Sequence, residues 1–168
     1  MKKVLFTALV SMAIFSCNTN TTAPTMDSHE FGTNYDSTAN MDLVRSTFKD
    51  MENFDSVSYI TKYADTAIFE DNGNKMSLTD NVHILSKMAA SGIKVKVDTT
   101  DYAMWSSHFN FKDGNQRDFV YTYISISFTK EDKTIKVKFF QADQFNKDGK
   151  IDREYLVYDQ SQLATILN

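Results

Sequence analysis

Three acidic residues that lie far apart in the sequence have the chemistry needed for acid/base work. Asp71 follows the apolar run at 66–70, Asp143 lies in the alternating segment "IKVKFFQADQF", and Glu154 lies in the last apolar segment. Successive side chains of a strand point to opposite faces. One face of the alternating segment therefore carries Ile135, Val137, Phe139, Gln141 and Asp143, and the other carries Lys136 and Lys138, which suit solvent.

This alternation predicts that Gln141 and Asp143 face the protein interior. A buried carboxyl needs a tyrosine hydroxyl, an amide or a ligand as a partner, because burying it unpaired is costly. If Asp71, Asp143 and Glu154 share a cavity and two of them lie close together, the pKa of one is raised and it can act as a general acid or base. Under the alternative interpretation, Asp143 and Glu154 lie at strand ends in water.

Other catalytic and metal-binding patterns are missing from the sequence. It has three scattered histidines and one cysteine, and it contains no HExxH pattern, Gly-rich phosphate loop or GxSxG elbow. The segment 146–152, "NKDGKID", has its glycine fourth rather than sixth and a lysine at a ligand position, so it indicates a hairpin turn rather than a calcium loop. We therefore predict no metal and no cofactor.

The composition indicates one acidic domain with a large core. A chain of 168 residues is by default a single domain, and 18 Lys+Arg against 22 Asp+Glu give a formal net charge of -4. This balance argues against nucleic-acid binding, which depends on clustered Lys and Arg. The 13 Phe, 8 Tyr and 1 Trp supply much core material, since each aromatic side chain buries roughly 150–250 Å².

The N-terminal residues indicate a bacterial lipoprotein. "MKK" is followed by an apolar run over 4–15, which suits a signal peptide over 1–16 and is shorter than the roughly 20 residues of a membrane span. "IFSC" resembles the lipobox, whose cysteine, here Cys17, carries the lipid. We expect a secreted protein that is lipid-anchored to the outer membrane or cell envelope, on its periplasmic or surface face. The alternative is an ordinary signal peptide with an incidental cysteine.

Residues 17–39 are rich in Thr, Asn and Ser and predict a flexible tether before a folded domain over 40–168. Asn40 can cap a first helix, whose apolar residues Met41, Val44, Phe48 and Met51 recur at helical spacing. A second short helix is expected over 54–64, a strand over 66–70 and a loop over 70–77. A third helix should begin after Ser77 or Thr79 and end at Gly92.

The rest of the chain predicts strands near 93–98, 102–112, 118–129, 134–146 and 151–158, followed by a helix over 160–168. The separators "KDGNQ", "KEDK" and "NKDGK" are turn-like. Helices followed by hairpin-linked strands predict an α+β fold. We expect a cone-shaped, curved antiparallel sheet wrapped around three N-terminal helices, with a short C-terminal helix.

This order of elements resembles the nuclear transport factor 2-like superfamily, which includes SnoaL-like polyketide cyclases and ketosteroid isomerases. "YADTAIFEDNG", 63–73, is similar to a Tyr-Ala-Asp-containing run of that superfamily, and "QADQFNKDGKIDREYLVYD", 141–159, resembles its closing hairpin. The likeness covers about 41–159. It is moderately specific for fold and poorly specific for function, because the superfamily contains enzymes and binding modules alike.

The resemblance implies where a site would lie. The general base of the isomerases falls on Asp71, while their two oxyanion donors fall on Thr47 and Gln141, so both donors differ here. It also implies that Glu154, Leu156 and Tyr158 face inward. Trp105 and His108, three apart on one strand, face opposite sides, and we expect Trp105 in the cavity. The predicted ligand pocket comprises Tyr63, Trp105, Phe139, Gln141, Glu154 and Tyr158, with Asp71 and Asp143 as candidate catalytic residues.

Tyr121 and Tyr123 predict a second feature, a homodimer interface. They lie on the face of strand 118–129 opposite Val120, Thr122 and Ile124, so they should be on the outer sheet surface. Members of the resembled superfamily often dimerise through that surface, and large amphipathic side chains suit an interface. The alternative is a solvated sheet surface.

Three functions remain open at this point. The first, which we favour, is a membrane-anchored domain that binds a small apolar molecule or a protein partner without catalysis, because two of the three isomerase groups are replaced. The second is a SnoaL-like enzyme of the isomerase, cyclase or dehydratase type, with Asp71 or Asp143 as base. The third is a structural dimer with a filled cavity. A void of a few hundred cubic ångströms would argue against the third, and a deep carboxylate bonded to a second polar group would favour the second.

Overall fold

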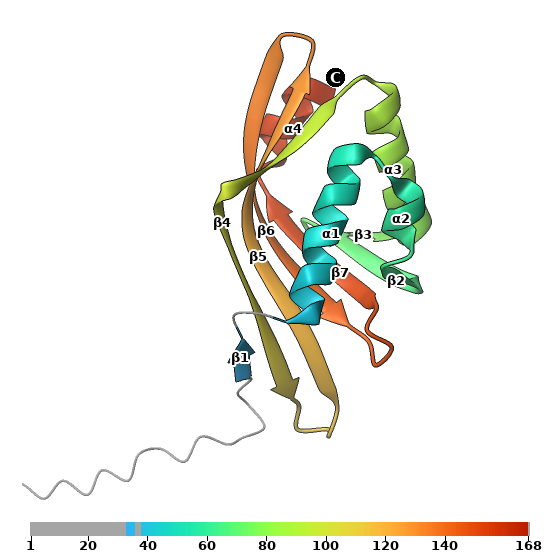
Figure 1. The fold of residues 1–168 in the computed structure, drawn as a ribbon. Coiled ribbons are helices and arrows are strands. Elements are labelled where there is room, and N and C mark those ends of the chain that lie inside the picture. Colours follow the sequence, from blue (N-terminus) through green and yellow to red (C-terminus); the bar gives the residue numbers. More distant parts are fainter. Residues whose placement is uncertain (1–32, 36–37, 168) are drawn as a thin grey trace, which may run out of the picture.

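The computed structural model describes residues 33–35 and 38–167 and has an α+β fold, as predicted (Figure 1). The helices are α1 Ala39–Asn53, α2 Ser56–Ile60, α3 Leu78–Ala90 and α4 Gln160–Leu167. The strands are β1 Thr33–Tyr35, β2 Tyr63–Asp71, β3 Asn74–Ser77, β4 Lys94–Asn110, β5 Gln116–Lys130, β6 Lys133–Phe145 and β7 Ile151–Tyr158. The predicted signal peptide 1–16, the lipid-attachment residue Cys17 and most of the tether 17–39 lie outside the described residues.

The strands form one curved sheet in the order β1-β4-β5-β6-β7-β2-β3, with α1, α2 and α3 on one side (Figure 1). Neighbouring strands are antiparallel except for β2 and β7, which are parallel. The sequence predicted only antiparallel pairs. A parallel pair needs a long connection rather than a hairpin, and here α3 and three long strands separate β2 from β7 in the chain.

The helices begin and end at recognisable caps. Thr38, rather than the predicted Asn40, caps α1, and its side chain accepts a hydrogen bond from the Met41 amide at 3.2 Å. Phe54 ends α1 in the left-handed region, so α2 is shorter than predicted. Ser77 caps α3 through a reciprocal capping box with Asp80, as the sequence suggested.

Three strand features differ from the sequence-based expectation. β1 lies within the predicted tether and pairs with β4. β3 occupies part of the segment expected as a loop and pairs with β2. β4 is one strand rather than the two predicted. The residues before and after a three-residue irregularity between Asp98 and Tyr102 all pair with β5.

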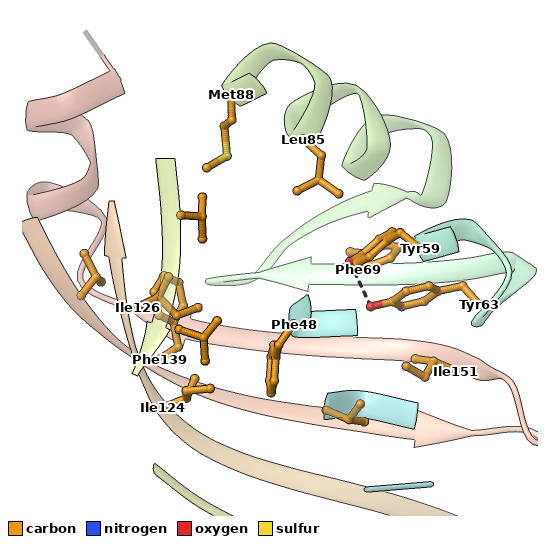
Figure 2. Packing of buried hydrophobic residues seen from close by; sticks show 14 of the residues in the cluster. Phe48, Tyr59, Tyr63, Phe69, Leu85, Met88, Ile124, Ile126, Phe139 and Ile151 are labelled. Carbon is orange, nitrogen blue, oxygen red and sulfur yellow. Dashed lines mark hydrogen bonds between the residues drawn. The ribbon is translucent and has the colours of Figure 1, made fainter. Parts of the chain in front are cut away.

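The core lies between the helices and the inner face of the sheet. β5 buries Val120, Thr122, Ile124, Ile126 and Phe128, which confirms the predicted inner face of this strand. Figure 2 shows Leu85 and Met88 of α3 pointing toward the sheet, on the side where Ile124 and Ile126 of β5 lie. None of the helices in the described part is long and apolar enough to cross a membrane.

Candidate functional site

The pairing of β6 with β7 places two buried carboxyls directly opposite each other. Asp143 of β6 pairs with Glu154 of β7, and their exposed fractions are 0% and 4%. Gln141, two residues before Asp143 and therefore on the same face, is 5% exposed. Lys136 and Lys138, in contrast, are exposed. The predicted alternation of β6 is thus confirmed.

Amide and hydroxyl donors surround this carboxyl pair. The Gln141 amide donates to both carboxyl oxygens of Asp143, at 2.9 and 3.0 Å. The Tyr63 hydroxyl donates to Glu154 Oε2 at 2.7 Å. It also lies 2.9 Å from the Tyr59 hydroxyl (Figure 2). A hydroxyl has one proton, so Tyr59 donates to Tyr63 when Tyr63 donates to Glu154. The result is a chain of donors that ends on Glu154.

Burial makes the carboxyl pair hold protons unusually tightly. Burial raises the pKa of Asp143 well above its ordinary value, and the neighbouring Glu154 raises it further. Burial also raises the pKa of Glu154 from 4.5 to about 7, although the hydrogen bonds from Tyr63 and Asp143 counteract part of this rise. The raised pKa of Asp143 favours its protonated form, which can donate a hydrogen bond to Glu154, and the Glu154 carboxyl is poised to gain or lose its own proton near neutral pH.

A third carboxyl, that of Asp71, lies where β2 ends beside β7. The Tyr158 hydroxyl donates to Asp71 Oδ2 at 2.9 Å, and burial raises the pKa of Tyr158 above its usual value, with Asp71 adding to the rise. The next residue, Asn72, has a φ of 46° and bonds both the backbone N–H and the C=O of Tyr158 at 3.1 Å. These bonds fix Asp71 against β7.

Glu154 and Asp71 line one cavity of about 130 Å³ between the sheet and the helices. Its walls are largely apolar and include three methionines, whose flexible side chains adapt to different shapes. A cavity of about 150 Å³ holds a benzene ring, so this one suits a compact molecule. The lining residues are Thr47, Phe48, Met51, Tyr59, Tyr63, Asp71, Met76, Asn81, Ile84, Leu85, Met88, Ile126, Phe128, Phe139, Gln141, Glu154, Leu156, Tyr158 and Leu163.

The described residues contain no cluster of three or more His, Cys, Asp or Glu that could hold a metal ion. Neither a family model nor a curated protein matches the sequence.

Solved structures, in contrast, match the fold over most of the chain. A protein from Shewanella putrefaciens CN-32 assigned to the SnoaL-like polyketide cyclases gives a TM-score of 0.56 at 12% identity, over 78% of this chain and 97% of that one. An NTF2-like protein from Burkholderia xenovorans LB400 gives 0.52 at 14% identity, over 80% and 100%. SalBIII, an epoxide hydrolase/cyclase-like enzyme of pyran ring formation in salinomycin, gives 0.53 at 12% identity, over 73% and 92%. The chain has the nuclear transport factor 2-like fold. At these identities the likeness establishes the fold alone.

The nuclear transport factor 2-like domain brings most of the predicted site residues together. Tyr63, Asp71, Phe139, Gln141, Glu154 and Tyr158 all line the cavity. Asp143 does not line it, and reaches it only through Gln141 and Glu154.

The prediction for Trp105 is wrong. Trp105 pairs across strands with Tyr121 and stacks on its ring, with the ring centroids 5.4 Å apart, so it lies on the outer face of the sheet. His108 does lie on the opposite side of β4 from Trp105, but it bonds Asp118 at 2.7 Å outside the cavity.

Two lining residues that the sequence reasoning missed come from helices. Tyr59 of α2 lies four residues before Tyr63, the first residue of β2, and this spacing was the only available signal. Asn81 belongs to the first turn of α3, and no sequence signal distinguished it from a solvated helix residue.

The two residues at the positions of the isomerase donors are both engaged within the protein. The Thr47 hydroxyl donates to the Val44 carbonyl at 2.8 Å, and the Gln141 amide is bonded to Asp143. Neither is free to stabilise an oxyanion on a substrate. A steroid nucleus is also much larger than a benzene-sized cavity. The geometry therefore does not support steroid isomerisation.

The outer face of the sheet carries a continuous aromatic surface. Tyr121 stacks on Trp105, Phe119 and Phe140, and the Lys138 ammonium lies 5.7 Å from the centroid of the Tyr123 ring. Tyr123 and Phe140 are 41% and 38% exposed. This is the surface that the sequence proposed as a dimer interface.

Proposed function

We propose that the domain binds a compact, mostly apolar molecule in the cavity and transfers a proton to or from it, with Glu154 as the acid/base residue. The observation that supports this proposal is the buried hydrogen bond from Tyr63 to a Glu154 carboxyl that lines the cavity. A carboxyl bonded to a second polar group deep in the cavity is the arrangement expected of an enzyme rather than of a simple binding domain.

Each group has a distinct part in this scheme. Glu154 in its ionised form takes a proton from a carbon or oxygen of the substrate, and in its protonated form returns one. Because the pKa of Glu154 is about 7, both forms are present near neutral pH, which is favourable for a general acid/base. Asp143 is a positioning residue, because it acts on the substrate only by bonding to Glu154. Tyr63 stabilises the ionised form of Glu154 by donating to it.

Binding without turnover is the second candidate, and the apolar lining of the cavity favours it. The cavity volume of about 130 Å³ is below the roughly 300–1,000 Å³ of most known ligand sites, so it restricts any ligand to a compact molecule and does not by itself argue against a structural domain with a filled cavity. A protein of this second type would retain a small ligand and show no reaction that depends on Glu154.

Benzisoxazole is a suitable probe of the proposed function, since it is compact, apolar and reports on a general base. The base takes the C3 proton, the electron pair of that bond forms a nitrile, and the N–O bond breaks to give 2-cyanophenolate. We expect turnover that rises with pH around the pKa of Glu154, and a loss of about 100-fold or more in Glu154→Gln.

Glu70→Gln is the matched control, because Glu70 is the same residue type on β2 but does not line the cavity. Its turnover should equal that of the wild type. If benzisoxazole binds in the cavity by NMR but Glu154→Gln reacts as fast as the wild type, the acid/base role of Glu154 is refuted and the non-catalytic candidate is favoured.

We further propose that the domain is anchored in the bacterial cell envelope by a lipid on Cys17. The proposal is supported by the "IFSC" motif after the apolar run at 4–15. The wild-type protein, made in a bacterial host, should enter the detergent phase of a Triton X-114 separation, and Cys17→Ser should remain in the aqueous phase. An unmodified Cys17 in the mass spectrum of the mature protein would contradict this.

A further inference from the structure

Two oxygen acceptors around the cavity lack a hydrogen-bond donor. Among the described residues, the buried side-chain oxygens without a partner are those of Asp71, Asn81, Ser106 and Thr122. Of these four residues, only Asp71 and Asn81 line the cavity. Buried polar atoms are nearly always paired, and an unpaired one is costly. A hydrogen-bond donor for these two oxygens therefore has to come from a molecule in the cavity.

The carboxyl of Asp71 cannot rotate to pair its Oδ1 without losing the hydrogen bond to its Oδ2. Its Oδ2 accepts from the Tyr158 hydroxyl, and Asn72 ties the adjacent backbone to both the N–H and the C=O of Tyr158. Rotation of the carboxyl to pair Oδ1 would break the bond to Tyr158. The unpaired Oδ1 is therefore a fixed feature of the site.

The position of Asp71 gives the cavity a second polar end. Asp71 pairs with Leu156 across the parallel strands, and Glu154 is two residues earlier on β7. From strand geometry, the Cα atoms of Asp71 and Glu154 are roughly 8 Å apart, and both side chains line the same space. A single six-membered ring with one substituent can therefore reach from one carboxyl to the other.

The charges of the lining define which substituent fits. The lining contains Asp71 and Glu154, and none of the described residues that line it is Lys, Arg or His. An anionic group would meet only carboxyls, amides and hydroxyls, without a compensating cation. A hydroxyl or amine, in contrast, donates to the unpaired oxygen of Asp71.

We infer that the cavity selects small ring compounds that carry a hydroxyl or amine, which donates to Asp71 while the rest of the ring lies against Glu154. This inference rests on the proposed function for the location of the ligand, but it concerns recognition rather than proton transfer. Asp71 is then a specificity-determining residue, and Asn81 offers the same donor a second acceptor.

Phenol and toluene test this inference, because they have the same size and shape and differ in one donor. Each is titrated into the full-length protein and followed by ¹H–¹⁵N NMR, with benzoate as the anionic comparison. A hydrogen bond to a carboxylate predicts that phenol binds about 10-fold or more tightly than toluene. Benzoate should bind more weakly than either.

Asp71→Asn should reduce the preference for phenol. The single acceptor oxygen of the asparagine would pair with the Tyr158 hydroxyl, so its NH₂ would face the ligand and could only donate to the phenol oxygen. A hydrogen bond between neutral groups is weaker than one to a carboxylate, so the phenol-to-toluene ratio should fall several-fold. Asp65→Asn is the matched control, since Asp65 is an exposed residue of the same strand, and it should keep the wild-type ratio. Thermal unfolding checks that both variants are folded.

The inference is overturned if phenol and toluene bind equally well to the wild type, if neither binds, or if Asp71→Asn keeps the wild-type phenol-to-toluene ratio. These outcomes are separable from a failure of the proposed function. A Glu154-dependent turnover of benzisoxazole alongside equal binding of phenol and toluene would leave the proton-transfer role intact and remove only the donor selectivity.

Discussion

Replacing Glu154 by glutamine should change how the stability of the protein depends on pH. The pKa of Glu154 is raised from 4.5 to about 7 in the folded protein, chiefly by burial. The folded state therefore binds this proton more tightly than the unfolded state does. The stability that results is fully present below pH 4.5 and is lost as the pH rises through about 7. Glutamine has a similar shape and can still accept from Tyr63, but it never has to bury a charge.

The magnitude follows from the size of the pKa rise. At about 1.4 kcal/mol per pH unit, a rise from 4.5 to about 7 corresponds to ~3 kcal/mol. The free energy of unfolding of Glu154→Gln, relative to the wild type, should therefore increase by ~3 kcal/mol between pH 4 and pH 8. Burial, the largest cause of the raised pKa of Asp143, persists in the variant and cancels in the difference, whereas the smaller contribution of Glu154 to that pKa is removed together with its charge.

Urea unfolding at closely spaced pH values and constant salt measures this difference directly. Glu70→Gln, which changes the same residue type outside the cavity, is measured alongside as the control. A flat difference for Glu154→Gln would refute the reasoning, because it would mean that Glu154 ionises in the folded protein as it does in the unfolded chain. The reasoning would also be refuted if the free energy of unfolding of Glu154→Gln, relative to the wild type, decreased as the pH rises.

Three further predictions concern the core, the strand junction and the outer face. Phe69→Ala should lower the free energy of unfolding by about 3–5 kcal/mol in urea, since Phe69 is 0% exposed, while Val157→Ala, at 59% exposure, should change it by less than about 0.5 kcal/mol. Asn72→Ala loses both bonds to Tyr158 and strains a positive φ, so calorimetry should show a loss of about 2 kcal/mol, part of which Asn72→Gly recovers. Sedimentation equilibrium should detect a dimer that Tyr121→Asp converts to a monomer, and a monomeric wild type would contradict the outer-face interface.

The sequence was sufficient to place the inner face of β6. Lys136 and Lys138 mark the solvent side of this strand, and a period of two then assigns Gln141 and Asp143 to the interior. The α+β class and the cap of α3 at Ser77 followed in the same way from local patterns. These features depend on residues that are close together in the chain, which is why the sequence revealed them.

Alternation could not decide the side on which Trp105 lies. The two faces of β4 both carry aromatic or partly buried residues, and Ser106 and Ser107 are both buried although they point in opposite directions. The three-residue irregularity after Asp98 also means that the alternation of side chains in the first half of β4 cannot be extended to the second half. Trp105 and His108 were correctly assigned to opposite faces of β4. The sequence reasoning placed Trp105 on the inner face, whereas it lies on the outer face and His108 lies on the opposite side.

The donors to the carboxyls depend on contacts that no local pattern contains. Tyr63 and Glu154 are 91 residues apart in the chain, and Asp71 and Tyr158 are 87 apart. Both contacts are set by the parallel pairing of β2 with β7, whereas the sequence suggested only antiparallel hairpins. The sequence thus indicated which residues face inward, but not which of them bond to each other.

The parallel pairing of β2 with β7 also affects the order in which the protein can be completed. β2 is the first long strand to leave the ribosome and β7 is the last. Tyr63 and Asp71 therefore cannot bond to Glu154 and Tyr158 until synthesis is nearly finished. Closing so long a loop is slow compared with forming the hairpins of β4, β5 and β6. A chain that stops before residue 151 could form those hairpins but would lack Glu154 and the other lining residues that β7 contributes to the cavity.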